Sequence, residues 1–132
     1  MDRSEHLKFI SNQLFCQGNF ELVESTFSSE YIAHAGEKTY SGHKFIKQFI
    51  KQVRKAIPDI RIVRIDILSN AENKLTWQRT FTGTNKFSLK GIAASNKKVK
   101  WYEIVVSRFE NDKIVEEWIS SDLAFQLMMK HK

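Results

Sequence analysis

Charged residues interrupt the apolar faces of several segments in the second half of the sequence. Between Leu75 and Thr84 apolar residues alternate with polar ones, and residues two apart share a face of an extended chain. This alternation places Arg79 between Trp77 and Phe81 on the apolar face. Desolvating a guanidinium there is costly unless it is paired or lines a wet cavity. We therefore expect Arg79 to line a ligand pocket.

Two further segments carry carboxylates in a similar setting. In VKWYEIVV the alternation places Glu103 among apolar neighbours, and in KIVEEWISS it places Glu116 on the face of Trp118. The other face of KIVEEWISS carries Glu117 and is no more apolar. Carboxylates on the inner face of a sheet are typical of a ligand pocket that works by acid–base chemistry or by binding alone.

A purely structural interpretation stands beside this one. Arg79 could pair with Glu103 or Glu116 across strands and fix the strand register without doing chemistry. The three tryptophans are either core residues or platforms for a ligand. They are Trp77, Trp101 and Trp118.

Asp122 raises the same question at the end of the last strand-like segment. It follows Ser120 and Ser121 and directly precedes the apolar run LAFQLMM, which predicts a helix. One interpretation makes Asp122 a catalytic acid or base at the mouth of a pocket. The other makes it the N-cap of the last helix, a position that favours aspartate.

Several other chemistries are not indicated. The four histidines show no metal-ligand spacing, and one cysteine, Cys16, offers neither a zinc site nor an internal disulfide. The sequence has no G-x-G-x-x-G, no phosphate-binding loop and no G-x-S-x-G elbow. We therefore expect no metal and no cofactor.

The composition indicates a packed globular protein. The 132 residues are 42% hydrophobic and 12% aromatic, which suits one domain over residues 1–132. The opening MDRSEHLKF carries charges where a signal peptide needs an apolar run, and no apolar stretch approaches the length of a membrane span. With its single cysteine, the chain is expected to be cytoplasmic and not membrane-bound.

The net charge of +6 raises the possibility of a nucleic-acid partner. The densest basic segment is HKFIKQFIKQVRKAIPD, in which lysines recur at helical spacing opposite an apolar face. No glycine-rich or aromatic binding element is interleaved with them, so we expect a solvated helix face and no nucleic acid.

The order of elements predicts an α+β fold with a sheet covered by helices on one face. Helices are expected first, then strands rich in β-branched and aromatic residues, then a short C-terminal helix. The expected helices span about 2–18, 20–27, 41–57 and 122–132, with Asn19 as a cap of the second; the expected strands span about 30–36, 60–68, 73–84, 98–110 and 113–121.

These segments together resemble the SnoaL-like polyketide cyclases and their ester-cyclase relatives. The resemblance runs from about Asn19 to the end. It rests on a G-x-x-x-x-x-x-F helix leading into P-D, an R-x-x-x-G-T strand, F-x-x-x-K-I-x-E-x-W and a D-L-A-F-Q-L tail. It implies an NTF2-like fold: a curved, mixed or antiparallel sheet wrapped by about three N-terminal helices and a short C-terminal helix into a cone with a pocket inside.

The family resemblance also implies a chemistry. In that family an Asp removes a proton from an activated carbon of a polyketide ester so that a ring closes, without metal or cofactor. His34, Arg79 and Asp122 match recurrent positions of the family. The sequence departs from it at Ile119, where many members carry the Asp, and at Val105, where many carry a His.

Two main hypotheses follow. In the first, the protein is an enzyme acting on a small hydrophobic carbonyl or ester compound, with Asp122, Arg79, His34 and Glu103 as catalytic residues. The expected substrate-binding residues are Tyr31, Trp77, Trp101, Glu116 and Trp118. In the second, it is a non-catalytic NTF2-like module that binds a small ligand or only dimerises through its sheet. A homodimer is expected in either case.

A third hypothesis is epoxide hydrolysis, in which an arginine flanked by two carboxylates activates water. Arg79 lacks a carboxylate two residues away on its own strand face, which ranks this hypothesis last.

Overall fold

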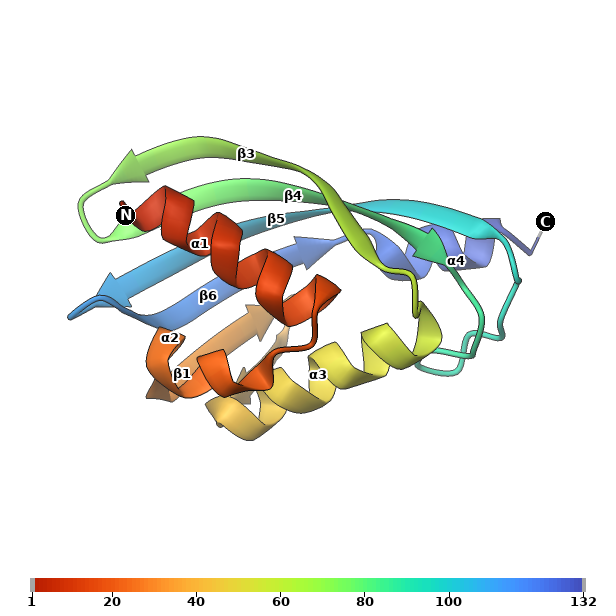
Figure 1. The fold of residues 1–132 in the computed structure, drawn as a ribbon, viewed down its shortest axis with the longest axis horizontal. Helices are drawn as coiled ribbons and strands as arrows, with labels where there is room; N and C mark the ends of the chain where they lie inside the picture. Colours follow the sequence, from red (N-terminus) through yellow and green to blue (C-terminus); the bar gives the residue numbers. More distant parts are fainter. Residues whose placement is uncertain (1, 132) are drawn as a thin grey trace.

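The computed structural model describes residues 2–131 as a curved six-stranded sheet with helices packed along its inner side (Figure 1). The helices are α1 (Arg3–Ser11), α2 (Val23–Thr26), α3 (Gly42–Ala56) and α4 (Leu123–Met129), with a π-helical turn at Asn12–Cys16 and a 3-10 turn at Phe20–Leu22. The strands are β1 (Phe27–Ala35), β2 (Lys38–Ser41), β3 (Arg61–Ala71), β4 (Lys74–Thr84), β5 (Lys98–Glu110) and β6 (Lys113–Ser121).

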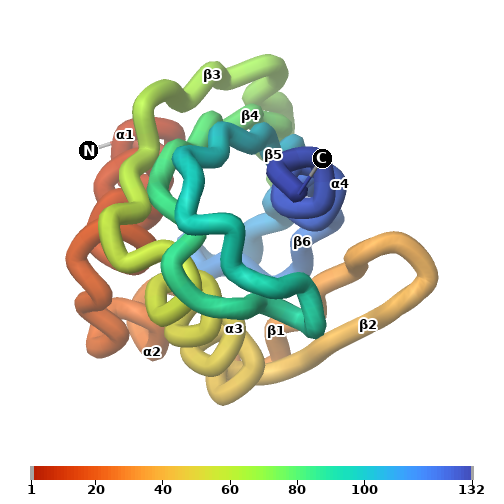
Figure 2. The backbone as a smooth tube through the Cα atoms, turned by 90° about the vertical axis from the view of Figure 1, so that its right-hand side faces the viewer, coloured from red at the N-terminus to blue at the C-terminus, as the bar shows by residue number. Residues whose placement is uncertain are grey.

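The strand order is β2-β1-β6-β5-β4-β3. All neighbouring strands run antiparallel except β1 and β6, which are parallel, so the sheet is mixed. Viewed end on, the strands form an open arc, with α1 and α3 on its inner side and α4 near the C-terminal end of β6 (Figure 2). The expected α+β architecture, with a curved sheet wrapped by helices, is confirmed.

Helix α3 shows how the sequence builds the inner layer. Its buried residues, Ile46, Ile50 and Val53, recur every three or four positions and face the sheet, while lysines take the solvent side. The helix ends at Ala56, two residues before Pro58, as the restricted backbone before proline predicts.

The N-terminal third departs from the expected elements. The first α-helix ends at Ser11 and continues as a π-helical turn, and the second α-helix is only four residues long. Asn19 makes no side-chain cap hydrogen bond, so its predicted capping role is wrong. β1 begins at Phe27, three residues earlier than expected, and β2 was not predicted because its four residues, KTYS, are too few to show a strand pattern.

The core lies between the concave face of the sheet and the helices. The four largest fully buried side chains come from β4, β5 and the residue that follows α3, and they are Trp77, Trp101, Phe81 and Ile57. Within residues 2–131 no helix is both long and apolar enough to span a membrane.

Candidate functional site

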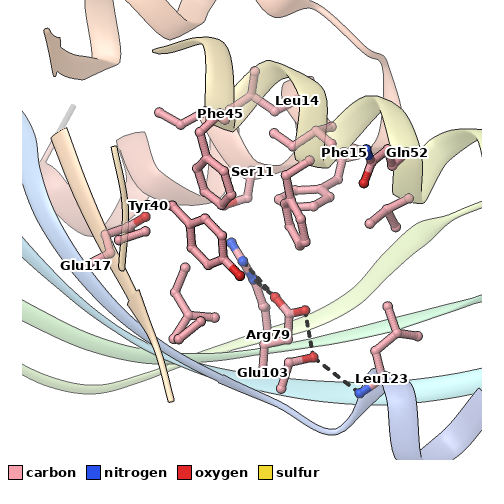
Figure 3. A pocket seen from close by; sticks show the side chains of 18 of the residues that line it. Ser11, Leu14, Phe15, Tyr40, Phe45, Gln52, Arg79, Glu103, Glu117 and Leu123 are labelled. Carbon is pink, nitrogen blue, oxygen red and sulfur yellow. Dashed lines mark hydrogen bonds and ion pairs between the residues drawn. The ribbon is translucent and has the colours of Figure 1, made fainter. Parts of the chain in front are cut away.

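A cavity of about 940 Å³ lies between the concave face of the sheet and the helices. Its wall is mostly apolar and takes residues from α1, α3, α4, the π-helical turn and five strands, and from the loop between β4 and β5. A few polar side chains interrupt this wall, and three of them, Arg79, Glu103 and Glu117, are charged residues of the sheet (Figure 3). A large apolar cavity with few polar groups is the usual form of a small-molecule site.

The strand register arranges the sheet wall in rows. Arg79 lies directly opposite Glu103, and Glu103 lies opposite Ser121. Two residues along each strand, about 7 Å away, Val105 lies opposite Ile119. In the next row Ser107 lies opposite Glu117. The polar groups of the cavity therefore come from two separate levels of the sheet.

Arg79 and Glu103 form a buried ion pair. The Arg79 Nε–H donates to Glu103 Oε1 at 2.8 Å, and Nη2 lies 2.6 Å from the same oxygen. The two residues are only 6% and 3% exposed. Ser121 Oγ donates to the second oxygen, Glu103 Oε2, at 2.9 Å, and accepts the backbone N–H of Leu123 at the start of α4. The pair is thus satisfied on both carboxylate oxygens, as a buried charge requires.

Aromatic rings enclose the guanidinium of Arg79. The carbon Cζ lies 4.8 Å from the ring centre of Phe15, 5.0 Å from that of Trp77 and 5.5 Å from that of Phe81. These contacts compensate part of the lost hydration through the ring quadrupoles. They also limit the directions in which the side chain can move.

The π-helical turn places Phe15 over this guanidinium. Arg54 of α3 donates from Nη1 to the Phe15 carbonyl at 2.7 Å, a group that a helix end leaves free. Gly18, with φ of +68°, lets Arg54 approach, because a Cβ at this position would lie 2.9 Å from the guanidine Nε. Helix α3 therefore positions a ring that faces Arg79.

Glu117 is the second charged level of the wall. The Tyr31 hydroxyl donates to Glu117 Oε1 at 2.7 Å, and Ser107 Oγ donates to Oε2. Ser107 in turn accepts the Trp77 Nε1–H at 3.0 Å. Burial raises the pKa of Glu117, while the hydrogen bond from Ser107 and the nearby charge of Arg79 act in the opposite direction.

A β-bulge explains why Glu117 and not Glu116 faces the cavity. The pairing of β5 with β6 shifts between Arg108–Glu116 and Phe109–Ile114, which leaves Val115 without an opposite residue. Ile114 and Glu117 are therefore both buried, although strict alternation would place them on opposite faces. The structure places Glu116 on the outer face, opposite to the sequence prediction.

The predicted site residues divide into those that line the cavity and those that do not. Arg79, Glu103, Trp77 and Tyr31 line it. Trp101 is buried behind the wall, stacked on Phe81 with ring centres 5.0 Å apart, and does not line the cavity. His34, Glu116, Trp118 and Asp122 are also absent from the cavity wall.

His34, Glu116 and Trp118 form a cluster on the outer face. His34 Nε2 lies 2.6 Å from Glu116 Oε2, and the imidazole stacks on Trp118 with ring centres 5.3 Å apart. Arg108 Nε donates to the other Glu116 oxygen at 3.0 Å. The hydrogen bond with His34 and the contact with Arg108 lower the pKa of Glu116. This cluster is separated from the cavity by the sheet itself.

Asp122 is the N-cap residue of α4, as one of the two interpretations expected, and it does not line the cavity. It precedes α4, but its side chain makes no N-cap hydrogen bond. Its Oδ1 accepts the Tyr102 backbone N–H at 2.8 Å, and its Oδ2 accepts from Gln126 Nε2 at 3.1 Å. Asp122 therefore attaches the start of α4 to β5.

Sequence reasoning did not select Glu117, although one signal pointed to it. Ile119, the position at which the resembled family carries an Asp, lines the cavity and lies opposite Val105. Glu117 is two residues before Ile119 and so shares its face. Among residues 2–131 no group of three or more His, Cys, Asp or Glu is arranged to hold a metal ion.

A curved mixed sheet wrapped by helices around an apolar cavity defines an NTF2-like α+β protein. The sequence model of the SnoaL-like polyketide cyclases matches residues 6–128, and the chain belongs to this family. No functionally curated protein matches the sequence significantly.

Solved structures share the whole fold at low sequence identity. A proposed polyketide cyclase from Acidithiobacillus ferrooxidans is 20% identical with a TM-score of 0.81, covering 99% of this chain and 98% of its own. TsrD from Streptomyces laurentii is 19% identical with a TM-score of 0.80, covering 96% and 97%. A SnoaL-like polyketide cyclase from Agrobacterium tumefaciens is 17% identical with a TM-score of 0.78, covering all of both chains.

Proposed function

We propose that the protein binds a small, mostly apolar carbonyl or ester compound in the cavity. It removes a proton from the carbon next to the carbonyl group of this compound without a cofactor. Glu117 acts as the general base, and Arg79 stabilises the enolate oxygen that forms. The observation that supports this most directly is a carboxylate in an apolar cavity wall, Glu117, whose pKa is raised by burial.

Removal of a proton next to a carbonyl group requires a base that is stronger than an ordinary carboxylate. Proton transfer is most efficient when the pKa of the base lies near the working pH, so a raised pKa improves Glu117 as a base. Tyr31 and Ser107 each donate to one oxygen, and a carboxylate has acceptor positions beyond these two. They hold the group in one orientation and leave it able to accept a proton from a ligand.

Arg79 suits the second role because its position is fixed before a ligand arrives. Its guanidinium is held by Glu103 and enclosed by aromatic rings. Prearranged positive charge stabilises a developing oxyanion without reorganisation, and this effect is large in a site that excludes water.

The test is deuterium exchange at the α-carbons of 2-tetralone, a small apolar ketone, followed by NMR in D2O. We expect catalysed exchange by the wild type and a loss of about 10²–10⁴-fold in Glu117→Gln. Glu30→Gln, on an exposed residue outside the cavity wall, is the matched control and should exchange at the wild-type rate. Binding of 2-tetralone without exchange above buffer would favour the non-catalytic binding module instead.

A second candidate function is hydrolysis of an epoxide. This chemistry uses an arginine flanked by two carboxylates, and β4 carries no carboxylate beside Arg79. However, Glu103 on β5 contacts Arg79, and the charges of Arg79 and Glu103 both act on the pKa of Glu117 on β6. One carboxylate would take the proton of the attacking water, and the other, as the acid, would protonate the ring oxygen. Conversion of 1,2-epoxytetralin to the diol in ¹⁸O-water, with no exchange of 2-tetralone, would favour this function.

The proposal includes a homodimer formed through the outer face of the sheet. Tyr102, Ile104 and Trp118 are large side chains on β5 and β6 that are 41%, 44% and 36% exposed. The helices α1 and α3 pack on the inner side of the sheet (Figure 2). A second copy of the chain would bury this apolar face.

A further inference from the structure

Two hydroxyl groups that line the cavity have no hydrogen-bond partner within residues 2–131. Ser11 is the last residue of α1 and is 4% exposed, and it lies in the stripe of Leu7, Ile10 and Leu14 that faces the cavity. Its hydroxyl is not one of the fully enclosed side-chain groups without a partner, which among the described residues are Thr26 Oγ1 and Trp101 Nε1, so it is open to the cavity. An apolar residue would complete this stripe better. The position therefore carries a donor that the folded chain itself leaves unused.

Tyr40 supplies the second hydroxyl from β2. It pairs with Ala33 of β1, which also lines the cavity, and its ring stacks on Phe45 at 4.5 Å with the planes 8° apart. This stacking holds the ring in place. Figure 3 shows the hydroxyl end of Tyr40 directed toward Arg79. Tyr40 is thus a donor held in place on β2 by its contact with α3.

Arg79 has an unused edge of its own. Its Nε and Nη2 contact Glu103, whereas Nη1 has no acceptor among the described residues. Donors from α1, β2 and β4 therefore line one cavity without protein acceptors. Such a set is suited to an oxygen atom of a ligand, which accepts hydrogen bonds and donates none.

The charged residues of the cavity wall indicate whether a ligand carboxylate or a neutral carbonyl group would bind there. Glu103 already compensates the charge of Arg79, and Glu117 adds a further carboxyl group. A ligand carboxylate would bring another negative charge into a desolvated site whose one buried cation is already paired. A ketone or ester carbonyl accepts the same hydrogen bonds at no such cost.

We propose that Ser11, Tyr40 and the free edge of Arg79 form a carbonyl-binding subsite that selects neutral ketones and esters over free carboxylic acids. This subsite deepens the proposed function, since it would hold the carbonyl whose α-proton Glu117 removes. It assigns binding roles to two residues, Ser11 and Tyr40, that act in recognition and not as bases.

The experiment compares four probes with one bicyclic body: 2-tetralone, tetralin, methyl 1,2,3,4-tetrahydro-2-naphthoate and the corresponding free acid. Dissociation constants are measured by NMR titration at pH 8 for the wild type, Ser11→Ala, Tyr40→Phe and the double variant. The matched controls are Ser29→Ala and Ser69→Ala, which remove hydroxyl groups from exposed residues outside the cavity wall. Circular dichroism and thermal melts check that each variant is folded.

We expect the wild type to bind the ketone and the methyl ester at least tenfold more tightly than tetralin and the free acid. Each single variant should weaken ketone binding about fivefold, the share of one neutral hydrogen bond, and leave tetralin binding unchanged. The control variants should behave as the wild type.

Three results would overturn the subsite: equal binding of ketone and tetralin, tighter binding of the free acid, or unchanged ketone binding in the double variant. Binding and chemistry remain separable, because Glu117→Gln should lose α-proton exchange and keep the preference for the ketone. A wild type that prefers the ketone but shows no exchange would contradict the proposed function and leave the subsite intact.

Discussion

The Tyr31 hydroxyl donates a 2.7 Å hydrogen bond to Glu117 Oε1 and so joins two residues 86 positions apart in the sequence. Burial and the adjacent Glu117 charge raise the pKa of Tyr31 well above its ordinary value, so Tyr31 keeps its proton throughout the neutral range. Glu117 is the partner that exchanges protons with solvent or ligand. This assignment makes the pH dependence of the protein testable.

We expect the stability of the wild type to carry a signature of Glu117. Because its folded pKa is raised above the ordinary 4.5, the folded state holds this proton where the unfolded state has lost it. The contribution of Glu117 to stability is present below pH 4.5 and is lost as the pH rises through the folded pKa. Glu117→Gln removes this dependence, so urea melts should show the variant gaining on the wild type as the pH increases.

The same group sets the direction of the rate profile. A base acts in its ionised form, so α-proton exchange should increase as the pH rises through the folded pKa of Glu117. The midpoint of this increase should lie above the ordinary carboxylate range and should be the pH at which the stability difference levels off. Midpoints that disagree would show that a different group limits the reaction.

A double-mutant cycle should show strong coupling between Arg79 and Glu103. Arg79→Met leaves the Glu103 carboxylate buried without a cation and is expected to cost about 3–5 kcal/mol of unfolding free energy. Replacing both residues by methionine removes both charges and should restore much of this loss. Urea denaturation of the four proteins measures the coupling.

The same double-mutant cycle also tests catalysis, which is measured separately from the free energy of unfolding. The double methionine variant should remain folded, yet it lacks the cation proposed to stabilise the enolate. Wild-type exchange of 2-tetralone by this variant would show that the ion pair only fixes the register of β4 and β5.

Much of this architecture was predictable because its signals are local. Helix α3 follows from its apolar period and Pro58, and the inward faces of β4 and β5 follow from strict alternation. Glu117 was not predictable in the same way. The bulge at Val115 depends on how β6 pairs with β5, and one extra residue moves every following side chain to the other face.

The proposed dimer makes a prediction on the outer face of the sheet. Ile104→Glu places a charge at the centre of the apolar patch and should convert a dimer to a monomer without unfolding it, because the residue is 44% exposed. Leu68→Glu is the control, since Leu68 is also apolar and is 57% exposed but lies on β3, at the edge of the sheet. Analytical ultracentrifugation measures both; a wild type that is monomeric at high concentration would rule out the dimer.

Asp122 is predicted to matter for stability and not for chemistry. The pairing of β5 with β6 ends at Glu103 and Ser121, so the Tyr102 N–H has no backbone partner there and donates to Asp122 Oδ1 instead. Asp122→Ala should lower the unfolding free energy by about 1–2 kcal/mol. Asp122→Asn keeps an acceptor oxygen and should cost less. Exchange of 2-tetralone per folded molecule should stay at the wild-type level in both variants, whereas a loss of 10²-fold or more in a folded Asp122→Asn would make Asp122 the base after all.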